Sequence, residues 1–181
     1  TISNSTVNSL FSTFPGYSPQ FTKDNLAATA YRTKSSDSWN FKYYSYDERK
    51  RVIKMWNIIS GNATFITEYR YNSQDQITIY WHTGPEDTKT YRNTYDYAGR
   101  LSKVDYYIGV PDIIEPEYIN IAEYSYNENS QVNSQRFNNN SLENIFSYNN
   151  RNWVKDIRNT DNYFRSENSY FKNGNVKTQN L

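Results

Sequence analysis

Cysteine is absent from this chain of 181 residues, and histidine and methionine occur once each. The absence of cysteine excludes disulfides, thiolate nucleophiles and cysteine-ligated metals. A single histidine excludes metal sites built from several imidazoles, and the loop spacing of an EF-hand calcium site is also missing. We therefore expect neither a cofactor nor a metal.

Long apolar runs and an excess of one charge are also missing. The chain has 20 basic and 19 acidic residues, a mean hydropathy of −0.98 and only five leucines. These values argue against a transmembrane helix, a secretory signal and a helical bundle. Nucleic-acid binding needs a concentrated basic surface, whereas the densest basic cluster, at 49–51, is what a solvated hairpin turn would carry. We expect no nucleic-acid partner.

Tyrosine is abundant, with 19 residues within an aromatic fraction of 18%. A hydrophobic fraction of only 36% would by itself suggest disorder. Tyrosine changes this expectation, because its ring supplies core area while its hydroxyl reaches water or a partner. The composition predicts a thin or strongly curved sheet whose faces are covered by tyrosine.

The tyrosines belong to a repeat in which Tyr-x-Tyr is followed by a turn and a short apolar strand. We call the second tyrosine of each copy the anchor; Asp or Asn follows it in five copies and Phe171 in the sixth. The anchors, 22 to 31 residues apart, are Tyr46, Tyr71, Tyr95, Tyr126, Tyr148 and Tyr170. The apolar residue six positions after each anchor, which we call the return residue, is Val52, Ile77, Leu101, Val132, Val154 or Val176.

Each copy has the pattern of a β-hairpin. Side chains two apart in a strand share a face, and the Asp or Asn after the anchor starts a turn. Four positions after the anchor, five copies have a turn former, including Gly99 and Gly174, which tolerate positive φ. Isolated hairpins are marginally stable, but stacked ones bury each other. We predict an all-β fold of tandem β-hairpins forming an open or curled antiparallel meander sheet.

The stretch Tyr95-Asp96-Tyr97-Ala98-Gly99-Arg100-Leu101 resembles the YD repeat, Tyr-x-Tyr-Asp-x-x-Gly-Arg-Leu, of RHS proteins and their relatives among bacterial surface and toxin proteins. The resemblance covers roughly residues 41–181, although four copies lack the glycine and four lack the arginine. In full RHS proteins the repeats wind a sheet into a hollow shell around a toxin. This degenerate array is more similar to the short YD-like surface proteins.

Two parts follow from the pattern. Residues 1–40 do not fit the repeat, and we predict that they form an N-terminal cap over the first sheet edge; within it, residues 24–31 fit either a short helix or a strand. Residues 41–181 form the hairpin array, interrupted by longer loops at 84–87 and 111–116. The sequence stops within the second strand of a hairpin, which we interpret as a fragment, a processed piece or an array completed by another strand.

Candidate ligand contacts are Tyr80, Trp81 and His82, which precede a loop and offer stacking platforms. The alternative, which we favour, is a strand end that packs its aromatics against the next hairpin. The four tryptophans likewise suit a sugar-binding strip or a core. Loop carboxylates would hydrolyse glycosides only if two faced each other; the candidates are Glu86, Asp87, Asp112, Glu115 and Glu117. No pattern pairs a nucleophile with a base, so we predict no enzyme.

These observations predict an extracytoplasmic repeat scaffold, secreted by a bacterium or held at its surface, with a structural or protein-interaction role. Its partner would be a protein or a larger assembly. One alternative is a carbohydrate-binding module that uses exposed aromatics. Another is an accessory subunit of a cell-envelope secretion or adhesion complex, whose sheet edges pair with a partner strand. A lipid anchor on a removed N-terminal segment is compatible with the sequence.

Overall fold

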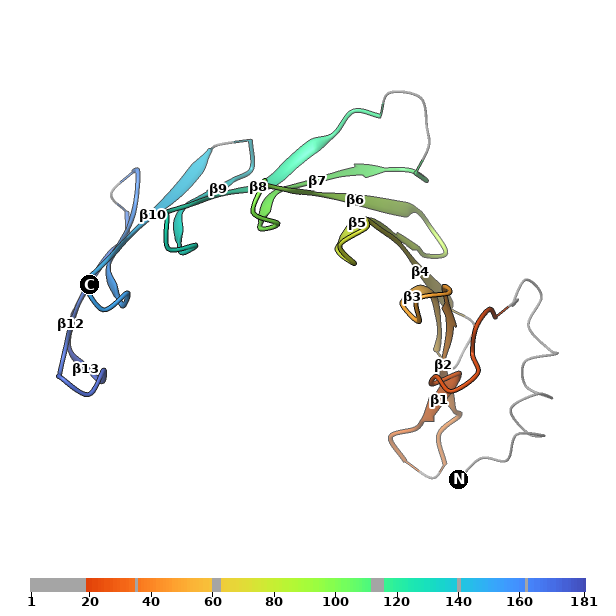
Figure 1. The fold of residues 1–181 in the computed structure, drawn as a ribbon. Helices are drawn as coiled ribbons and strands as arrows, with labels where there is room; N and C mark the ends of the chain where they lie inside the picture. Colours follow the sequence, from red (N-terminus) through yellow and green to blue (C-terminus); the bar gives the residue numbers. More distant parts are fainter. Residues whose placement is uncertain (1–18, 35, 60–62, 112–115, 140, 162) are drawn as a thin grey trace. The chain divides into compact units, whose positions relative to one another are not determined.

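The computed structural model describes residues 19–34, 36–59, 63–111, 116–139, 141–161 and 163–181. Thirteen strands, and no helix, occur among these residues, so none of them belongs to a helix long enough to cross a membrane. The strands follow one another in sequence order through one sheet, with β1 and β13 as its edge strands (Figure 1). The predicted all-β meander of tandem hairpins is confirmed.

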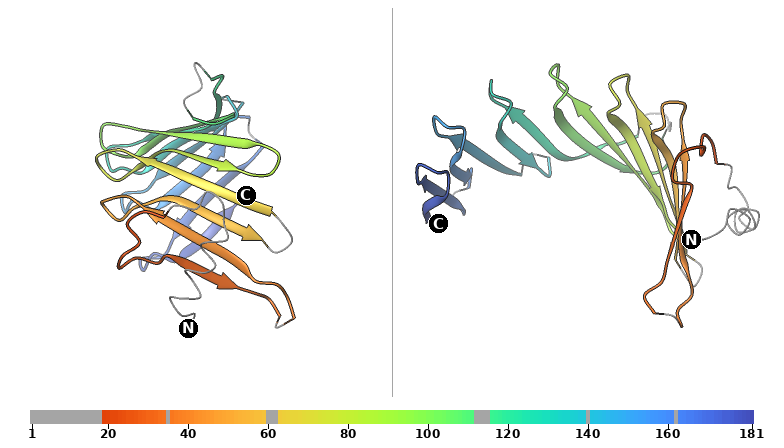
Figure 2. Two further views of the ribbon diagram at one scale, coloured as in Figure 1. Left: turned by 90° about the vertical axis from the view of Figure 1, so that its right-hand side faces the viewer. Right: turned by 60° about the horizontal axis from the view of Figure 1, so that its bottom comes forward.

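The strand bounds are β1 Ala28–Tyr31, β2 Asn40–Tyr46, β3 Val52–Ile59, β4 Ala63–Tyr71, β5 Ile77–Thr83, β6 Thr88–Tyr95, β7 Leu101–Ile108, β8 Ile119–Tyr126, β9 Val132–Phe137, β10 Leu142–Tyr148, β11 Val154–Asn159, β12 Arg165–Tyr170 and β13 Val176–Asn180. The chain divides into two compact units. The first comprises residues 1–90 and 108–114, and the second comprises residues 91–107 and 115–181. Figure 2 shows the strands of each unit running side by side.

The repeat pattern sets the strand ends. In all six copies a strand ends at the anchor tyrosine and the next strand begins at the return residue. In the first copy, for example, Tyr46 lies opposite Val52 across the hairpin, and the ladder shifts by one residue just before Tyr46. The same shift precedes the anchor in the copies around Tyr71, Tyr126, Tyr148 and Tyr170. A β-bulge therefore accompanies the turn in each of these hairpins.

The Asp or Asn after the anchor builds the turn with its side chain. Asp47 Oδ1 accepts the backbone N–H groups of Arg49 and Arg51, each at 2.9 Å. The equivalent residues Asn72, Asp96, Asn127 and Asn149 accept the same two N–H groups in their own copies. Phe171 cannot do so, and in that copy Asn173 Oδ1 instead accepts the N–H of Asn175 at 3.1 Å. The repeat is thus a repeated Asx turn.

Four positions after each anchor the backbone has positive φ. The angle is 61° at Lys50, where no turn former stands, and 77° and 92° at Gly99 and Gly174. The other three copies place Asp75, Ser130 and Asn152 in the same conformation, with φ of 61° to 63°. The hydrogen bonds of the Asx side chain and of the flanking backbone hold Lys50 in a region that non-glycine residues otherwise avoid.

Aromatic side chains dominate what is buried. Among the described residues, the buried apolar side chains are Tyr43, Tyr46, Trp56, Tyr107 and Ala122. In the first unit Tyr43 lies opposite Trp56 across β2 and β3, and only 2% of the Tyr43 surface is exposed. The core therefore consists of tyrosine and tryptophan rather than leucine and isoleucine.

The segment before the array lies along β2. Ala28–Tyr31 pairs antiparallel with β2, so of the two forms expected for residues 24–31 the structure has a strand. Gln20 donates its N–H to Ser45 Oγ at 2.9 Å, and its carbonyl accepts the N–H of Tyr46 at 3.1 Å. Residues 1–18 of the predicted cap lie outside the described residues.

Candidate functional site

The three residues predicted to contact a ligand do not share one surface. They lie within β5, and successive side chains of a strand alternate between its two faces. Tyr80 and His82 therefore share one face, and their rings meet edge to face at 5.5 Å. Trp81 projects from the opposite face.

On their face, Tyr80 and His82 contact the neighbouring strand β4. Tyr80 stacks on Tyr69, with ring centroids 6.4 Å apart. His82 Nδ1 lies 2.9 Å from the hydroxyl of Thr67, which is buried. Partial burial of the imidazole lowers the pKa of His82 below its ordinary value. Both rings therefore make contacts within their own hairpin, formed by β4 and β5.

On the other face, Trp81 donates its indole N–H to Glu68 Oε2 at 3.0 Å, and the Arg70 guanidinium lies 5.3 Å from its ring centroid. A shallow depression of about 410 Å³ includes these three side chains, Lys54 and Trp56. Lys54 and Glu68 form an ion pair at 2.9 Å. Lys54 thus has a carboxylate partner within the depression, and Arg70 lies against the Trp81 ring.

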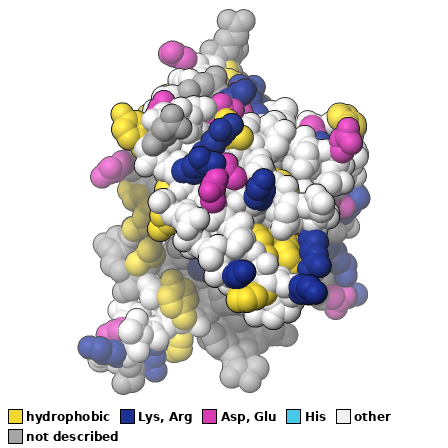
Figure 3. All heavy atoms as spheres, turned by 90° about the vertical axis from the view of Figure 1, so that its left-hand side faces the viewer, with side chains coloured by type: hydrophobic (Ala, Val, Ile, Leu, Met, Phe, Trp, Pro, Cys, Tyr) yellow, Lys and Arg dark blue, Asp and Glu magenta, His cyan; other side chains and the backbone are white. Residues whose placement is uncertain are grey.

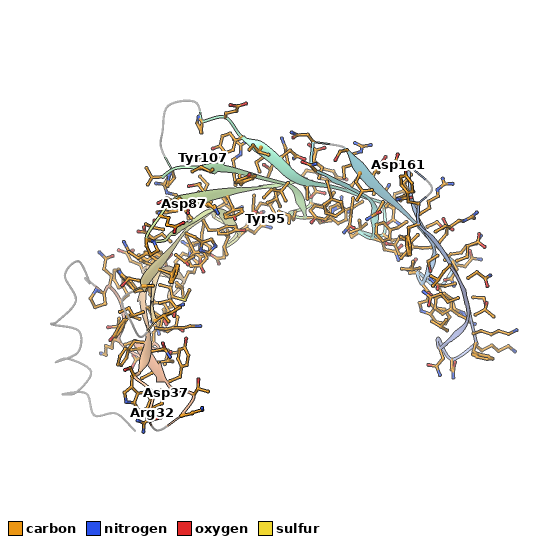
Figure 4. The ribbon with its side chains drawn as sticks, turned by 180° about the vertical axis from the view of Figure 1, so that it is seen from behind. Arg32, Asp37, Asp87, Tyr95, Tyr107 and Asp161 are labelled. Atoms are coloured by element: carbon orange, nitrogen blue, oxygen red, sulfur yellow. The ribbon has the colours of Figure 1, made fainter. Side chains whose placement is uncertain are left out.

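Of the candidate loop carboxylates, Glu86, Asp87 and Glu117 lie within the described residues. Asp87, labelled in Figure 4, lies in the connection between β5 and β6, with its carboxylate 3.5 Å from the ammonium group of Lys89. Asp112 and Glu115 fall outside the described residues. Among those that are described, no group of three His, Asp or Glu side chains is arranged to hold a metal ion.

The most regular feature is a row of links between consecutive hairpins. The hydroxyl of Tyr71 donates to the carbonyl of Val52 at 2.7 Å, and that of Tyr126 donates to Leu101 at the same distance. Tyr148 and Tyr170 donate likewise to Val132 and Val154, and Tyr46 donates to Leu26. In four of these links the acceptor is the return residue of the preceding hairpin. The sequence pattern had paired these positions within one hairpin and missed the bond between hairpins.

In the first and third hairpins, which retain the arginine of the YD motif, that arginine adds further contacts between consecutive turns. Arg51 donates Nε to Asp47 in its own turn at 2.6 Å, and Nη1 to the Asn72 carbonyl and Asp75 carboxylate of the next turn at 3.3 and 2.6 Å. Its guanidinium lies 4.5 Å from the ring centroid of the next anchor, Tyr71. One side chain thus joins two turns through charge, hydrogen bonds and a cation–π contact.

The third hairpin repeats this arrangement. Arg100 donates to Asp96 at 2.7 Å and to Ser130 at 3.1 Å, and lies 4.5 Å from the ring centroid of Tyr126. Desolvation opposes ionisation of Asp96, but hydrogen bonds from the Arg100 backbone and guanidinium outweigh it and lower the pKa. The basic cluster at 49–51 is likewise engaged in turn-to-turn contacts, since Arg49 pairs with Asp75 at 2.9 Å.

A second charged cluster surrounds Asp105 in the second unit. Its carboxylate, only 1% exposed, accepts hydrogen bonds from Arg92 at 2.8 Å and Asn120 at 3.2 Å and pairs with Lys103 at 3.2 Å. Burial alone would raise the pKa of Asp105, but these three partners together lower it. The Arg92 guanidinium also lies 3.6 Å from the Tyr118 ring centroid. Because each charge has a partner, we interpret the cluster as structural.

Comparisons with known proteins give a similarity of fold. No protein-family model matches the chain, and no curated protein matches it. A solved structure described as TcdB2-TccC3-Cdc42 is similar in fold, with a TM-score of 0.60 at 13% sequence identity. The similarity covers 76% of this chain and 7% of that one. At this identity it shows a shared fold alone, and this chain spans a small part of the other protein's length.

Proposed function

We propose that the chain is an extracytoplasmic bacterial scaffold whose role is structural or is to present a surface to a protein partner. The observation that carries this proposal is the row of links in which an anchor hydroxyl reaches the preceding hairpin. Charged residues serve the same purpose, since Arg51 joins Asp47 of its own turn to Asp75 of the next turn. Similarity of fold to TcdB2-TccC3-Cdc42 supports the scaffold role, and the YD-like motif supports a secreted or surface location.

The proposal assigns no catalytic activity to the chain. A catalytic centre needs a nucleophile or a general base within reach of a reacting group, and a base that is oriented by a third group. The single histidine, His82, contacts Thr67 and Tyr80 rather than a carboxylate–nucleophile pair. The Asp105 carboxylate, the most buried one described, is neutralised by basic partners.

The experiment that tests the scaffold role compares two substitutions in the full chain. We expect Val154→Asp to abolish the cooperative thermal transition, because it places a charge at a half-buried return residue next to a link. His82→Ala should change the free energy of unfolding by no more than about 1 kcal/mol, the worth of one hydrogen bond. A cooperative melt that survives Val154→Asp would contradict the proposal.

Location and assembly need separate measurements. If the protein is extracytoplasmic, protease added to intact cells of the source bacterium will degrade it while a cytoplasmic control protein survives. Light scattering in line with size exclusion gives the oligomeric state of the purified chain. A protein protected in intact cells would contradict the location.

A further inference from the structure

The fifth hairpin lacks one of the side-chain hydrogen bonds that join other hairpins to the next turn. Five residues after the anchor, Arg51, Arg100 and Gln131 each donate to a carbonyl of the next turn. The fifth hairpin has Trp153 there; its backbone takes part in the hydrogen bonds of the turn, and its ring centroid lies 5.2 Å from the Arg151 guanidinium. Within the described residues the indole N–H of Trp153 has no hydrogen-bond partner. An indole cannot replace the bridging guanidinium or amide, so its presence needs another explanation.

The link itself is kept by a different residue. Arg151 Nη1 donates to the Lys172 carbonyl in the next turn at 2.7 Å. Tryptophan at this position also leaves the amide of Asn149 without the acceptor that its equivalents have. Asn72 and Asn127 each donate Nδ2 to the side chain of the glutamine in their own turn, and the fifth turn has no such glutamine. Trp153 therefore leaves two donors, its own N–H and the Asn149 amide, available at one place without weakening the row.

These donors border a depression of about 550 Å³ between the fifth and sixth turns, a volume typical of small-molecule sites. Trp153 forms one wall, with its ring 5.1 Å from that of Tyr170 and tilted by 52°. The indole is held in place by the next turn, because a Cβ at Gly174 would lie 3.2 Å from its edge. The depression is thus lined by fixed aromatic rings.

The charge at this depression is uniformly positive. Arg151, Lys155 and Lys172 line it, and no carboxylate does. Asp156 alternates with Lys155 along β11 and points to the opposite face, where it pairs with Arg165 at 3.0 Å. Figure 3 shows basic side chains bordering hydrophobic ones on the side of the molecule that it draws. Unlike the depression at Trp81, whose lining includes Glu68, this one has three basic side chains and no carboxylate in its lining.

We propose that this depression binds an acidic sugar, in the form of an oligosaccharide that contains uronic acid residues. The flat apolar face of a sugar ring stacks on Trp153 beside the Arg151 guanidinium, its hydroxyls meet the Asn149 amide, and its carboxylate meets the basic side chains through charge-assisted hydrogen bonds. A neutral sugar would leave the three cations unused. Single-stranded nucleic acid would need a positively charged groove that tracks many phosphates, and here the cations surround a single depression.

Calorimetric titration of the full chain with tetragalacturonate tests this site, and its fully methyl-esterified form serves as the uncharged ligand of the same shape. We expect binding of the acid and at least tenfold weaker binding of the ester. Trp153→Gln installs the residue found at this position in the second and fourth hairpins, so it should fold with an unchanged melting temperature and lose at least tenfold in affinity. Lys155→Gln with Lys172→Gln should remove the preference for the acid.

The control is Trp81→Phe, which alters the depression of the first unit and should leave the affinity unchanged. Absence of binding at millimolar tetragalacturonate overturns the proposal, as does equal binding of acid and ester or equal binding by folded Trp153→Gln. Tighter binding of a short single-stranded oligonucleotide, lost in Trp153→Gln, would assign the site to nucleic acid instead. None of these outcomes depends on the scaffold role, because the melt reports that separately.

Discussion

At the scale of single residues, the anchor hydroxyls distinguish this array from a simple row of hairpins. Four of the described links satisfy a backbone carbonyl at a strand start with a side chain from the following copy. Burial raises the pKa of Tyr71, Tyr126 and Tyr148, so these phenols stay protonated and remain donors across the ordinary pH range. The tyrosines therefore act both as core and as connector.

Removing one of these hydroxyls should weaken the array by the worth of one hydrogen bond. Tyr126→Phe deletes the donor to Leu101 while keeping the ring, so we expect the free energy of unfolding to fall by about 0.5–1.5 kcal/mol in urea titrations. Tyr97→Phe is the matched control, because Tyr97 is fully exposed, and it should have no effect. Equal effects of the two substitutions would show that the link adds nothing.

Asp105 makes stability depend on pH at the acidic end. Its pKa is lowered in the folded protein, so its contribution is complete above the unfolded value of about 3.9 and is lost as the pH falls through the lowered folded value. We expect unfolding free energies measured from pH 6 to pH 2.5 to fall less steeply in Asp105→Asn than in the parent chain. The control is Asp37→Asn, which removes a carboxylate outside the cluster and should leave the pH dependence as it is in the parent chain. Asp37 is labelled in Figure 4. A slope unchanged by Asp105→Asn would contradict the assignment.

Sequence reasoning found the anchors but not their partners. The interval from Tyr46 to Val52 is local, and hydrogen bonding within a turn obeys local chemistry. The donation from Tyr71 to Val52 depends on how the next hairpin stacks, which no local pattern encodes. The same holds for Asp105, which meets Arg92 and Asn120 from neighbouring strands. At Lys50 the residue type alone would not predict the backbone conformation, since the turn imposes positive φ on a residue that does not favour it.

At the scale of the elements, neighbouring turns constrain each other's sequence. Gly174 has φ of 92° and lies against Trp153 of the preceding hairpin, whereas Lys50, Asp75, Ser130 and Asn152 occupy the same turn position without glycine. Two requirements therefore favour glycine in the sixth hairpin. Its own backbone has positive φ, and the Trp153 ring of the preceding hairpin leaves little room for a Cβ. Only the first is visible in the local sequence.

A double-mutant cycle separates these two demands. Gly174→Ala should cost more than the roughly 1–2 kcal/mol expected for left-handed backbone alone, because the new methyl meets the indole. In the Trp153→Gln background the cost should fall to that of Gly99→Ala, where φ is 77°. Additive effects of the two substitutions, measured by urea unfolding, would show that the contact carries no energy.

The strand pattern itself was the most predictable part of the fold. The Asx turns and the alternation of tyrosine and valine are short-range signals, so the strand ends at the anchors and the starts at the return residues follow from sequence. The proposed site at Trp153 was harder to find, because tryptophan also suits the core of this chain. Its signal was a mismatch between copies, an apolar ring where Arg or Gln stands in four of the other hairpins.

At the scale of the whole molecule, the array is built from nearest-neighbour contacts. Strands pair with the next strand in sequence, and the described turn links reach one hairpin along. Stability in such repeat proteins is approximately a sum of copies and interfaces. The two compact units are consistent with this local organisation.

Local coupling predicts a local response in hydrogen exchange. Tyr148→Phe removes the link to Val132, so amides of β9 to β11 should exchange faster, by up to about tenfold for a loss of about 1.4 kcal/mol. Amides of β2 to β4 in the first unit should keep their rates. A uniform acceleration along the chain would mean that the array unfolds as a single cooperative block instead.

The direction of the turn links also bears on how the chain is made. Because four return-residue carbonyls receive a hydroxyl from the hairpin that follows, such a hairpin, on emerging from the ribosome, waits for the next anchor, 22 to 31 residues after its own. At the usual pace of synthesis this delay is about one to six seconds. The nascent protein would thus always carry one unfinished hairpin at its growing end, and earlier hairpins would already be closed and shielded from misassembly.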